Sequence, residues 1–460
     1  MTTPPRALVG DELEVPCTGD VSRRYLSLDA AASTAALPSV VRRVADFMPW
    51  YSSVHRGAGY KSQMATAAYE DARVAAMRFA GRSDTDDVAI ICRNTTEAIN
   101  HLAYRLQLTS GDSVVATVAE HHANLLPWSR TGAAMRYVEC DRAGTFTVDD
   151  VIEVLDRGPV PRLLAITGAT NVTGWLPPID QIIAAAHDRG VPVVVDAAQL
   201  APHRPMPANA DFVAWSGHKM YAPYGAGVLI GPRTAFTEGD PFLAGGGAVD
   251  LVDLDEVVWS DPPEREEAGS PNVVGAVALG AAIDELTDIG WDRLIEHERE
   301  LAGHLRSGVD AIPGVRLLGP ALDQETLAIA TFVVEEVPHA LVAARLAAEF
   351  GIGVRHGCFC AHPYLVRLLG LSADEIARYR EAVLRGDRRT IPGAVRASAG
   401  ISVSTEDVDR FLGALSVIAD GTPPPVEYHQ DTVTGDFWPR DDEAPWPTTD
   451  HEVGAPCARG

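Results

Sequence analysis

Long hydrophobic runs and basic charge are both scarce in this chain of 460 residues. No stretch approaches the ~20 consecutive apolar residues that a membrane helix needs, and the first residues lack a basic segment followed by an apolar one. The 38 Lys and Arg residues are outnumbered by 63 Asp and Glu residues, which gives a formal net charge of −25. Such a surface repels nucleic acid and anionic membranes. We therefore expect a soluble, cytoplasmic protein with neither as a partner.

Cysteine is also scarce. The six cysteines are too few and too scattered for a disulfide-stapled fold of this length, so we expect reduced thiols. The exception is the pair Cys358 and Cys360 in the run Arg355–His362, which could be a metal knuckle, a redox pair or a nucleophile. No second Cys/His cluster has the spacing that would complete a tetrahedral zinc site, so we expect no metal.

Alternating periodicities indicate the fold class. With 46% hydrophobic residues, the chain can bury one large core and a smaller one. From residue 21, helical periodicity alternates with short β-branched runs, which is typical of a mostly parallel α/β sheet. A helix at Ile179–Arg189, ended by Gly190, completes one βαβ unit. The predicted strands are Val88–Cys92, Ser113–Val118, Leu163–Thr167, Val191–Asp196 and Phe212–Trp215.

The pattern changes in the second half of the chain. Ala276–Leu305 predicts one or two helices that lead out of the large domain. The runs that follow suggest a small α+β module, and Ser404 with Asp407 predicts the cap of a last helix, Glu406–Ile418. The module's other elements are expected at Leu327–Val334, Ala340–Phe350 and Val395–Val403.

These patterns divide the chain into four parts. We expect an N-terminal arm, a large domain whose first residues pack on the small domain, a small α+β domain, and a C-terminal tail. Their bounds are 1–20, 21–283, 284–420 and 421–460. The tail has no usable periodicity, and we expect it to lie extended on the surface, tied down by Trp438 and Trp446.

Two charged residues at predicted strand ends indicate the chemistry. Lys219 follows the strand Phe212–Trp215 among small residues, where partial desolvation lowers its pKa and makes the amine a nucleophile toward an aldehyde. Asp196 ends a run of three valines, and a buried carboxylate there is costly unless it meets a cation. The protonated pyridine nitrogen of pyridoxal 5′-phosphate (PLP) is such a cation. Either residue alone has an ordinary structural explanation. Together, they predict that Lys219 holds PLP as a Schiff base.

Further motifs occur in the same order as in a known family. They are Tyr25–Ser33, Val54–Gly57, Arg93–Asn100, Glu120–Asn124, Asp196–Gln199, Ser216–Lys219, Gly245–Gly247, Glu267–Asn272 and Arg355–His362. Over about residues 21 to 418 the chain resembles class V of the fold-type I PLP enzymes, specifically type II cysteine desulfurases and selenocysteine lyases. The resemblance implies a large, mostly parallel sheet domain with a smaller α+β C-terminal domain, a PLP cofactor and a homodimer.

The resemblance also implies roles for individual residues. The catalytic residues would be Lys219, His121 and Cys360, with His121 stacked on the pyridine ring. The groups that hold the rest of the cofactor would be Gln199 on the phenolic oxygen, Asn171 near the same oxygen, and Thr95, Thr96, Ser216 and His218 on the phosphate. Ser270 would reach the phosphate of the neighbouring subunit. The expected substrate contacts are Arg396 as a carboxylate clamp, Arg355, Asn171 and His55. Arg355 could instead form a structural ion pair.

Cys360 falls where type II desulfurases place the cysteine that attacks the substrate sulfur. A thiolate on a mobile loop near cations suits that role, and Arg355, His356 and His362 supply such a cluster. The loop departs from the type II pattern, because Cys358 and Phe359 replace two histidines. Its Gly-Cys-Phe-Cys run resembles molybdenum cofactor sulfurases instead.

The resemblance therefore implies a desulfurase that converts L-cysteine to L-alanine. Lys219 would remove the Cα proton, and Cys360 would carry a persulfide for an acceptor protein or small molecule. The alternatives are another class V enzyme that does not use Cys360 in this way: a carbon–sulfur lyase acting on a larger cysteine-derived substrate in a biosynthetic pathway, an aminotransferase, or an epimerase. A noncatalytic scaffold would bind no cofactor.

Overall fold

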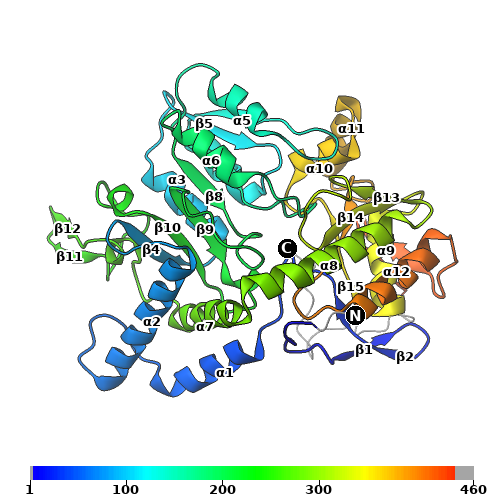
Figure 1. Ribbon diagram of the computed structural model, residues 1–460, viewed down its shortest axis with the longest axis horizontal. Coiled ribbons are helices and arrows are strands. Elements are labelled where there is room, and N and C mark those ends of the chain that lie inside the picture. The colour runs from blue at the N-terminus through cyan, green and yellow to red at the C-terminus, as the bar shows by residue number, and fades with distance from the viewer. Residues whose placement is uncertain (1–3, 441–460) are drawn as a thin grey trace.

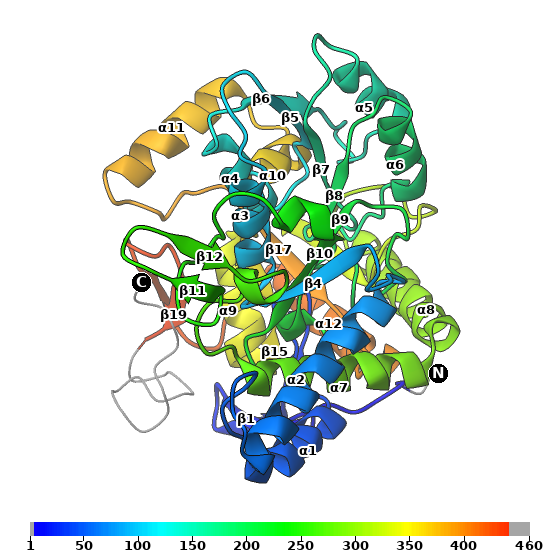
Figure 2. The same cartoon turned by 90° about the vertical axis from the view of Figure 1, so that its left-hand side faces the viewer.

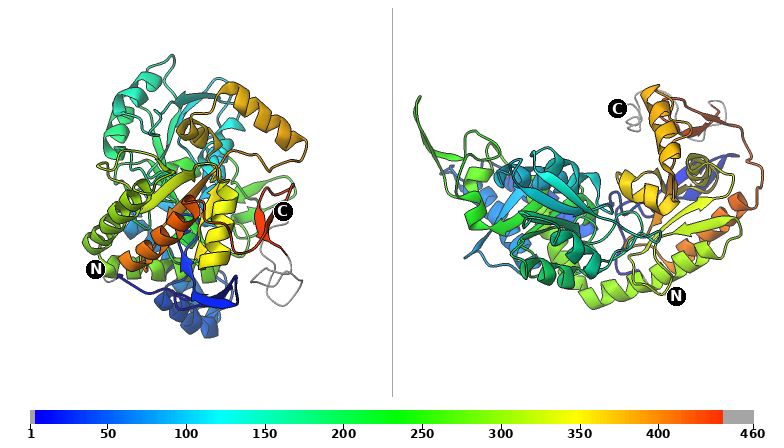
Figure 3. Two further views of the ribbon diagram at one scale, coloured as in Figure 1. Left: turned by 90° about the vertical axis from the view of Figure 1, so that its right-hand side faces the viewer. Right: turned by 90° about the horizontal axis from the view of Figure 1, so that it is seen from above.

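The computed structural model describes residues 4–440. Trp446, expected to tie down the tail, lies outside the described residues. Two lobes make up the molecule, a larger one around a seven-stranded sheet and a smaller one around a four-stranded sheet (Figure 1; Figure 3, right). Within residues 4–440, no helix has the length and apolar character needed to cross a membrane.

The seven-stranded sheet has the order β4-β10-β9-β8-β7-β5-β6. Strand β10 runs opposite to the other six strands, so the sheet is mixed but mostly parallel. Its strands are β4 (Asp87–Cys92), β5 (Ser113–Thr117), β6 (Ala134–Val138), β7 (Leu163–Thr167), β8 (Val193–Asp196), β9 (Phe212–Ser216) and β10 (Gly227–Pro232). The five predicted strands are confirmed to within two residues at each end. Runs of β-branched residues located them because both faces of this sheet are buried.

Helices cover both faces of the large sheet. The predicted helix after β7 is α6 (Ile179–His187), and it ends through Gly190, whose φ of +68° places it in the left-handed region that glycine adopts most easily. On the side that Figure 1 shows below the sheet, α1 and α2 pack against α7. The other helices of this lobe are α1 (Pro38–Phe47), α2 (Tyr60–Phe79), α3 (Thr95–Arg105), α4 (Leu126–Ser129), α5 (Val148–Leu155) and α7 (Val273–Ile289).

The smaller lobe has its own antiparallel sheet, in the order β13-β14-β17-β16. Its strands are β13 (Val315–Leu318), β14 (Ile329–Val334), β16 (Arg355–Gly357) and β17 (Ala394–Ser398). A separate hydrophobic core, with Phe332 and Phe411 at its centre, joins this sheet to its helices. These helices are α8 (Trp291–Asp310), α9 (His339–Phe350) and α12 (Thr405–Ala419).

Local capping and pairing fix how the smaller lobe begins and ends. The expected Ala276–Leu305 helical region is two helices, α7 and α8, broken at Gly290. The cap predicted at Ser404 is a capping box with Asp407, so α12 begins at Thr405. The N-terminal strand β3 (Leu26–Ser27) pairs with β15 (Ile352–Gly353) in this lobe. The other short elements are the hairpins β1 (Glu14–Cys17) with β2 (Val21–Arg24) and β11 (Val249–Val252) with β12 (Val257–Trp259), and the helices α10 (His362–Leu369) and α11 (Ala373–Leu384).

The described part of the tail is more ordered than the sequence suggested. Strands β18 (Tyr428–Gln430) and β19 (Phe437–Pro439) form an antiparallel hairpin, and β19 lies beside α9 (Figure 2). Asp431 Oδ1 accepts hydrogen bonds from the N–H groups of Val433 and Thr434, and Gly435 has a φ of +81°. This turn chemistry forms the hairpin without the alternating hydrophobic pattern on which strand prediction depends.

Candidate active site

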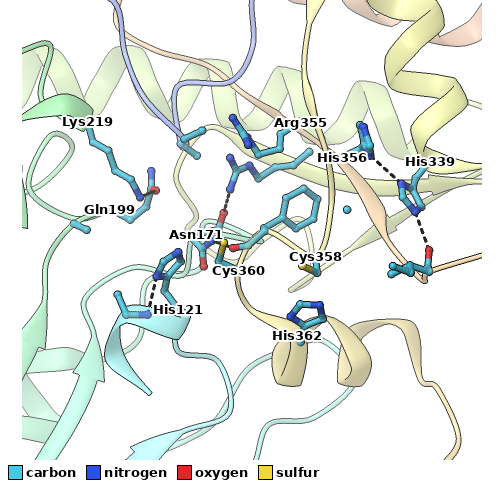
Figure 4. A pocket seen from close by; sticks show the side chains of 18 of the residues that line it. His121, Asn171, Gln199, Lys219, His339, Arg355, His356, Cys358, Cys360 and His362 are labelled. Atoms are coloured by element: carbon cyan, nitrogen blue, oxygen red, sulfur yellow. Dashed lines mark hydrogen bonds between the residues drawn. The ribbon is translucent and has the colours of Figure 1, made fainter. Parts of the chain in front are cut away.

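One cavity of about 690 Å³ lies between the two lobes, at the carboxyl ends of the parallel strands. Side chains from both lobes line it, and Figure 4 labels ten of the 18 that it draws. It brings together twelve of the fourteen residues predicted for the site. They are Thr95, Thr96, His121, Asn171, Asp196, Gln199, Ser216, His218, Lys219, Arg355, Cys360 and Arg396.

Lys219 lies in a short turn directly after β9, at the inner end of this cavity. Its Nζ donates a hydrogen bond to Gln199 Oε1 at 3.3 Å. Burial lowers the pKa of Lys219 to about 8, although the negative charge of Asp196 acts in the opposite direction. Near neutral pH a substantial fraction of this amine is therefore uncharged and nucleophilic.

Asp196 ends β8 and is 4% exposed. One carboxylate oxygen accepts a hydrogen bond from the N–H of Ala198 at 3.0 Å. Burial raises the pKa of this carboxyl, and the charge of Lys219 offsets only part of the effect. A cationic ligand group next to Asp196 would restore the ionised form.

The start of α3 and the end of β9 form a hydroxyl-rich surface. The Thr95 N–H donates to Ser216 Oγ at 2.8 Å, and the two hydroxyl oxygens are 2.7 Å apart. Thr96 follows in the first turn of α3, and His218 lines the same cavity. Hydroxyl groups at a helix N-terminus favour an anion such as phosphate.

His121 is held by a backbone contact and is next in sequence to Glu120, the centre of a buried polar network for which the sequence predicted no role. Its Nδ1 accepts a hydrogen bond from the Ala123 N–H at 3.1 Å, and burial lowers its pKa to about 3, so the ring is neutral. The preceding Glu120 is fully buried and accepts hydrogen bonds from Thr117 Oγ1 and Asn124 Nδ2. Burial raises the pKa of Glu120 to about 8. The Glu-His-His-Ala-Asn motif was the available signal, but it does not show which polar residues face inward.

Arg396 and Arg355 share one carboxylate, that of Asp29. Arg396 is buried on β17, where it donates to Asp29 Oδ1 at 3.1 Å and to the Asn171 carbonyl oxygen at 2.7 Å. Arg355, its partner in the β16–β17 register, lies 3.0 Å from Asp29 Oδ2. Burial lowers the pKa of Arg396 to about 10. The ion pair considered for Arg355 is thus present, and Asp29 is a site residue for which no role was predicted from the sequence.

The loop that carries Cys360 is held in place by backbone carbonyl groups. The Phe359 carbonyl oxygen accepts from Asn171 Nδ2 at 2.7 Å, and the Cys360 carbonyl oxygen accepts from the His122 N–H at 2.8 Å. Phe359 and Cys360 both have positive φ angles, and the Phe359 ring packs under the Arg396 guanidinium. The Cys360 side chain is exposed in the cavity, where Lys219 and Arg396 also lie.

The expected cationic cluster around Cys360 is weaker than the sequence suggested. Arg355 shares the Asp29 carboxylate with Arg396, and burial lowers the pKa of His362, whose ring stacks on that of His122. Lys219 and Arg396 line the same cavity as Cys360. The expectation of a mobile loop also differs from the fixed hydrogen bonds just described.

Two predicted site residues lie elsewhere. His55 and Ser270 line a second cavity of about 520 Å³, which does not include Lys219. His55 Nε2 lies 3.0 Å from Glu70 Oε1, and its ring meets Tyr69 edge-on, so within one chain it is held away from the main cavity. The role of His55 as a substrate contact stays a prediction. Ser270 was expected to act on a neighbouring subunit, and that role stays a prediction.

Comparison with known families agrees with this fold and geometry. The family described as aminotransferase class-V matches residues 26–411. The chain belongs to this family.

Two relatives of the chain are named for the same activity. The chain is 37% identical to a probable cysteine desulfurase of Halalkalibacterium halodurans, over 76% of this chain and 87% of that protein. It is 34% identical to a cysteine desulfurase of Cronobacter sakazakii, over 84% and 92% of the two chains. Among solved structures, it is similar to the apo cysteine desulfurase of Thermococcus onnurineus NA1. That comparison has a TM-score of 0.77 and 32% identity, and it covers 86% of this chain and 95% of the other.

Proposed function

We propose that this protein is a PLP-dependent cysteine desulfurase, which converts L-cysteine to L-alanine and passes sulfur from Cys360 to an acceptor. Family membership and the names of the relatives support this assignment. The observation that carries it is that one cavity holds both a half-buried lysine of lowered pKa and an exposed cysteine. An enzyme that moves sulfur from a PLP-bound amino acid needs both groups within reach of one substrate.

The inner end of the cavity fits PLP. Asn171 Oδ1 is buried without a hydrogen-bond partner among residues 4–440, and Asp196 is a buried carboxyl that a ring N–H⁺ would satisfy. Lys219 would hold the aldehyde carbon, and the neutral His121 ring would lie on the pyridine face. Gln199 would meet the phenolic oxygen, and the hydroxyl groups of Thr95, Thr96 and Ser216 would hold the phosphate. When bound, PLP supplies an electron sink for the Cα of the amino acid.

The chain's own residues then divide the remaining work. Arg396 orients the substrate carboxylate as a guanidinium fork, in exchange for part of its contact with Asp29. The Lys219 amine would take the Cα proton and later return a proton to the product. The Cys360 thiolate attacks the substrate sulfur. A sulfur–sulfur bond forms to Cys360, the carbon–sulfur bond breaks, and the carbon part leaves as alanine after protonation.

We also propose that the protein acts as a homodimer, in which Ser270 of one chain contacts the cofactor phosphate of the other. The position of Ser270 in a cavity apart from Lys219 supports a role outside its own chain. Light scattering of the purified protein would measure its mass, which should be twice that of one chain.

Product analysis with L-cysteine tests the proposed activity. Given one equivalent of L-cysteine per active site and no other thiol, the wild type should release about one alanine per active site, because Cys360 keeps the sulfur. With a thiol reductant it should turn over repeatedly. Cys360→Ser should lower alanine formation by roughly a hundredfold or more, because the hydroxyl is a poor nucleophile toward sulfur.

Cys140→Ser is the matched control, since Cys140 is half-buried and lines a different cavity. It should behave as the wild type does. Wild-type turnover that yields a keto acid would indicate an aminotransferase, and a D-amino acid would indicate an epimerase. Alanine formation by Cys360→Ser at the wild-type rate would refute the sulfur-carrying role.

A further inference from the structure

The main cavity continues beyond Cys360 into an outer end with different walls. Residues of α9's first turn, of the segment before β17, and of the C-terminal hairpin line this end. They are Pro338, His339, Arg388, Arg389, Gln430 and Asp436. Gln430 and Asp436 lie beyond residue 411, where the family match ends. The outer end is therefore partly built from sequence that the family pattern does not cover.

Hydrogen bonds hold the outer wall together. His339 Nε2 lies 3.1 Å from the Ile391 carbonyl oxygen. Because a carbonyl oxygen can only accept, Nε2 carries the proton of the neutral ring. His339 Nδ1 therefore accepts a hydrogen bond from His356 Nδ1, 3.2 Å away. The other nitrogen of His356 lies 3.3 Å from Asp436 Oδ1, which ties the hairpin to β16 (Figure 4 shows the two histidines). The wall is thus a defined surface next to the loop of Cys360.

The outer end offers an unneutralised cation. Arg388 is exposed, and one of its guanidinium nitrogens donates to the Val433 carbonyl oxygen at 2.9 Å. No carboxylate of residues 4–440 forms an ion pair with it, whereas the neighbouring Arg389 is paired with Asp387. The Gln430 amide donates both its N–H groups to backbone carbonyl oxygens, which leaves its own oxygen as an acceptor. A ligand with a carboxylate and a hydrogen-bond donor suits this pair.

Cys360 lies between the two ends of the cavity. In Figure 4 it is placed between Lys219 on one side and His356 and His339 on the other, and Cys358 lies toward the outer side. It lines the same cavity as Lys219 and Arg396 at the inner end, and its loop continues from β16, which carries His356 at the outer end. Sulfur taken up by Cys360 from the inner end can therefore be removed from the outer end.

We propose that the outer end binds a small thiol that carries a carboxylate, and that this thiol is the sulfur acceptor. The inference rests on the proposed desulfurase function. The acceptor thiolate attacks the terminal sulfur of the Cys360 persulfide. A bond forms between the acceptor sulfur and that terminal sulfur, the bond to Cys360 Sγ breaks, and Cys360 leaves as a thiolate, so no external oxidant or reductant is needed. Arg388 holds the acceptor carboxylate.

A single-turnover experiment tests this site. The wild-type enzyme is loaded with one equivalent of L-cysteine and separated from the alanine formed. It is then mixed with 3-mercaptopropionate or with 3-mercaptopropan-1-ol, which has a hydroxymethyl group in place of the carboxylate. Loss of the Cys360 persulfide is followed by mass spectrometry against thiol concentration. Both rates should saturate, with a half-saturating concentration about tenfold lower for the carboxylate, as expected for one charge-assisted contact.

Arg388→Gln should bring the two half-saturating concentrations to within about twofold of each other. Arg380→Gln, an exposed arginine on α11 outside this cavity, should keep the tenfold preference. If the wild type forms no alanine in the loading step, the proposed function fails. If alanine forms but neither thiol saturates, as with a protein acceptor, or if Arg388→Gln keeps the preference, the inference about the outer end is wrong.

Discussion

The inner and outer ends of the cavity are formed by different kinds of secondary structure. At the inner end, Asp196 is the last residue of one strand, and Lys219 lies in the turn after another strand, of a sheet that is buried on both faces. At the outer end, Arg388 and Asp436 lie on a loop and in a hairpin, and their side chains are exposed or half-buried. Rigid strand ends suit chemistry that requires fixed geometry, whereas loops can change to fit a partner. The contrast indicates that the inner end determines the reaction, whereas the outer end determines the choice of acceptor.

The largest effect should come from removing the inner amine. Lys219→Ala should lower alanine formation by roughly a thousandfold or more, because the residue both holds the cofactor and moves the Cα proton. The chain contains only one other lysine, Lys61, which is exposed on α2. Borohydride reduction in the presence of PLP should therefore label one lysine peptide, that of Lys219. The Lys61→Ala variant should be labelled on the Lys219 peptide and should be as active as the wild type. Label on Lys61 in the wild type would contradict the assignment.

A second prediction concerns pH. Because burial lowers the pKa of Lys219 to about 8, the uncharged amine increases about tenfold for each pH unit up to that value and little above it. The rate at which the cofactor-free protein takes up PLP should follow the same curve, monitored by absorbance. Asp196→Asn should move the break to lower pH, because the carboxylate is the largest influence that raises this pKa. A break near the ordinary lysine value would mean that the amine is solvated.

The same contrast explains what could be predicted from the sequence. The strands that position Asp196 and Lys219 are runs of buried β-branched residues, a strong local signal, and the residues after them follow from topology. The role of Asp29 could not be predicted, because it depends on two arginines that are 326 and 367 positions away in the chain. The outer wall was missed because the hairpin depends on turn chemistry at Asp431 and Gly435 rather than on periodicity.

Charge removal at Asp29 should show how rigid the inner end is. Asp29→Asn leaves the buried Arg396 without its carboxylate, and this should lower the free energy of unfolding by about 2 kcal/mol, since Asp29 itself is partly exposed. Urea unfolding would measure the change. Asp46→Asn, an exposed residue on α1, is the control and should be neutral. If the free energy of unfolding fell as little as in the control, the Asn171 carbonyl group would already satisfy the hydrogen bonding of Arg396.

The smallest effect should come from the corresponding change at the outer end. Asp436→Asn removes the partner of His356, but both side chains are more than a quarter exposed, so the unfolding free energy should change by less than about 1 kcal/mol. The change should be local, and amide hydrogen exchange in residues 428–439 should become faster while the large sheet stays protected. The His356 contact lowers the pKa of Asp436, so the contribution of this carboxylate is present near neutral pH and fades as the pH falls through the carboxyl range. If Asp436→Asn were as costly as Asp29→Asn, the outer wall would be as fixed as the strand ends, and its adaptability could not explain the choice of acceptor.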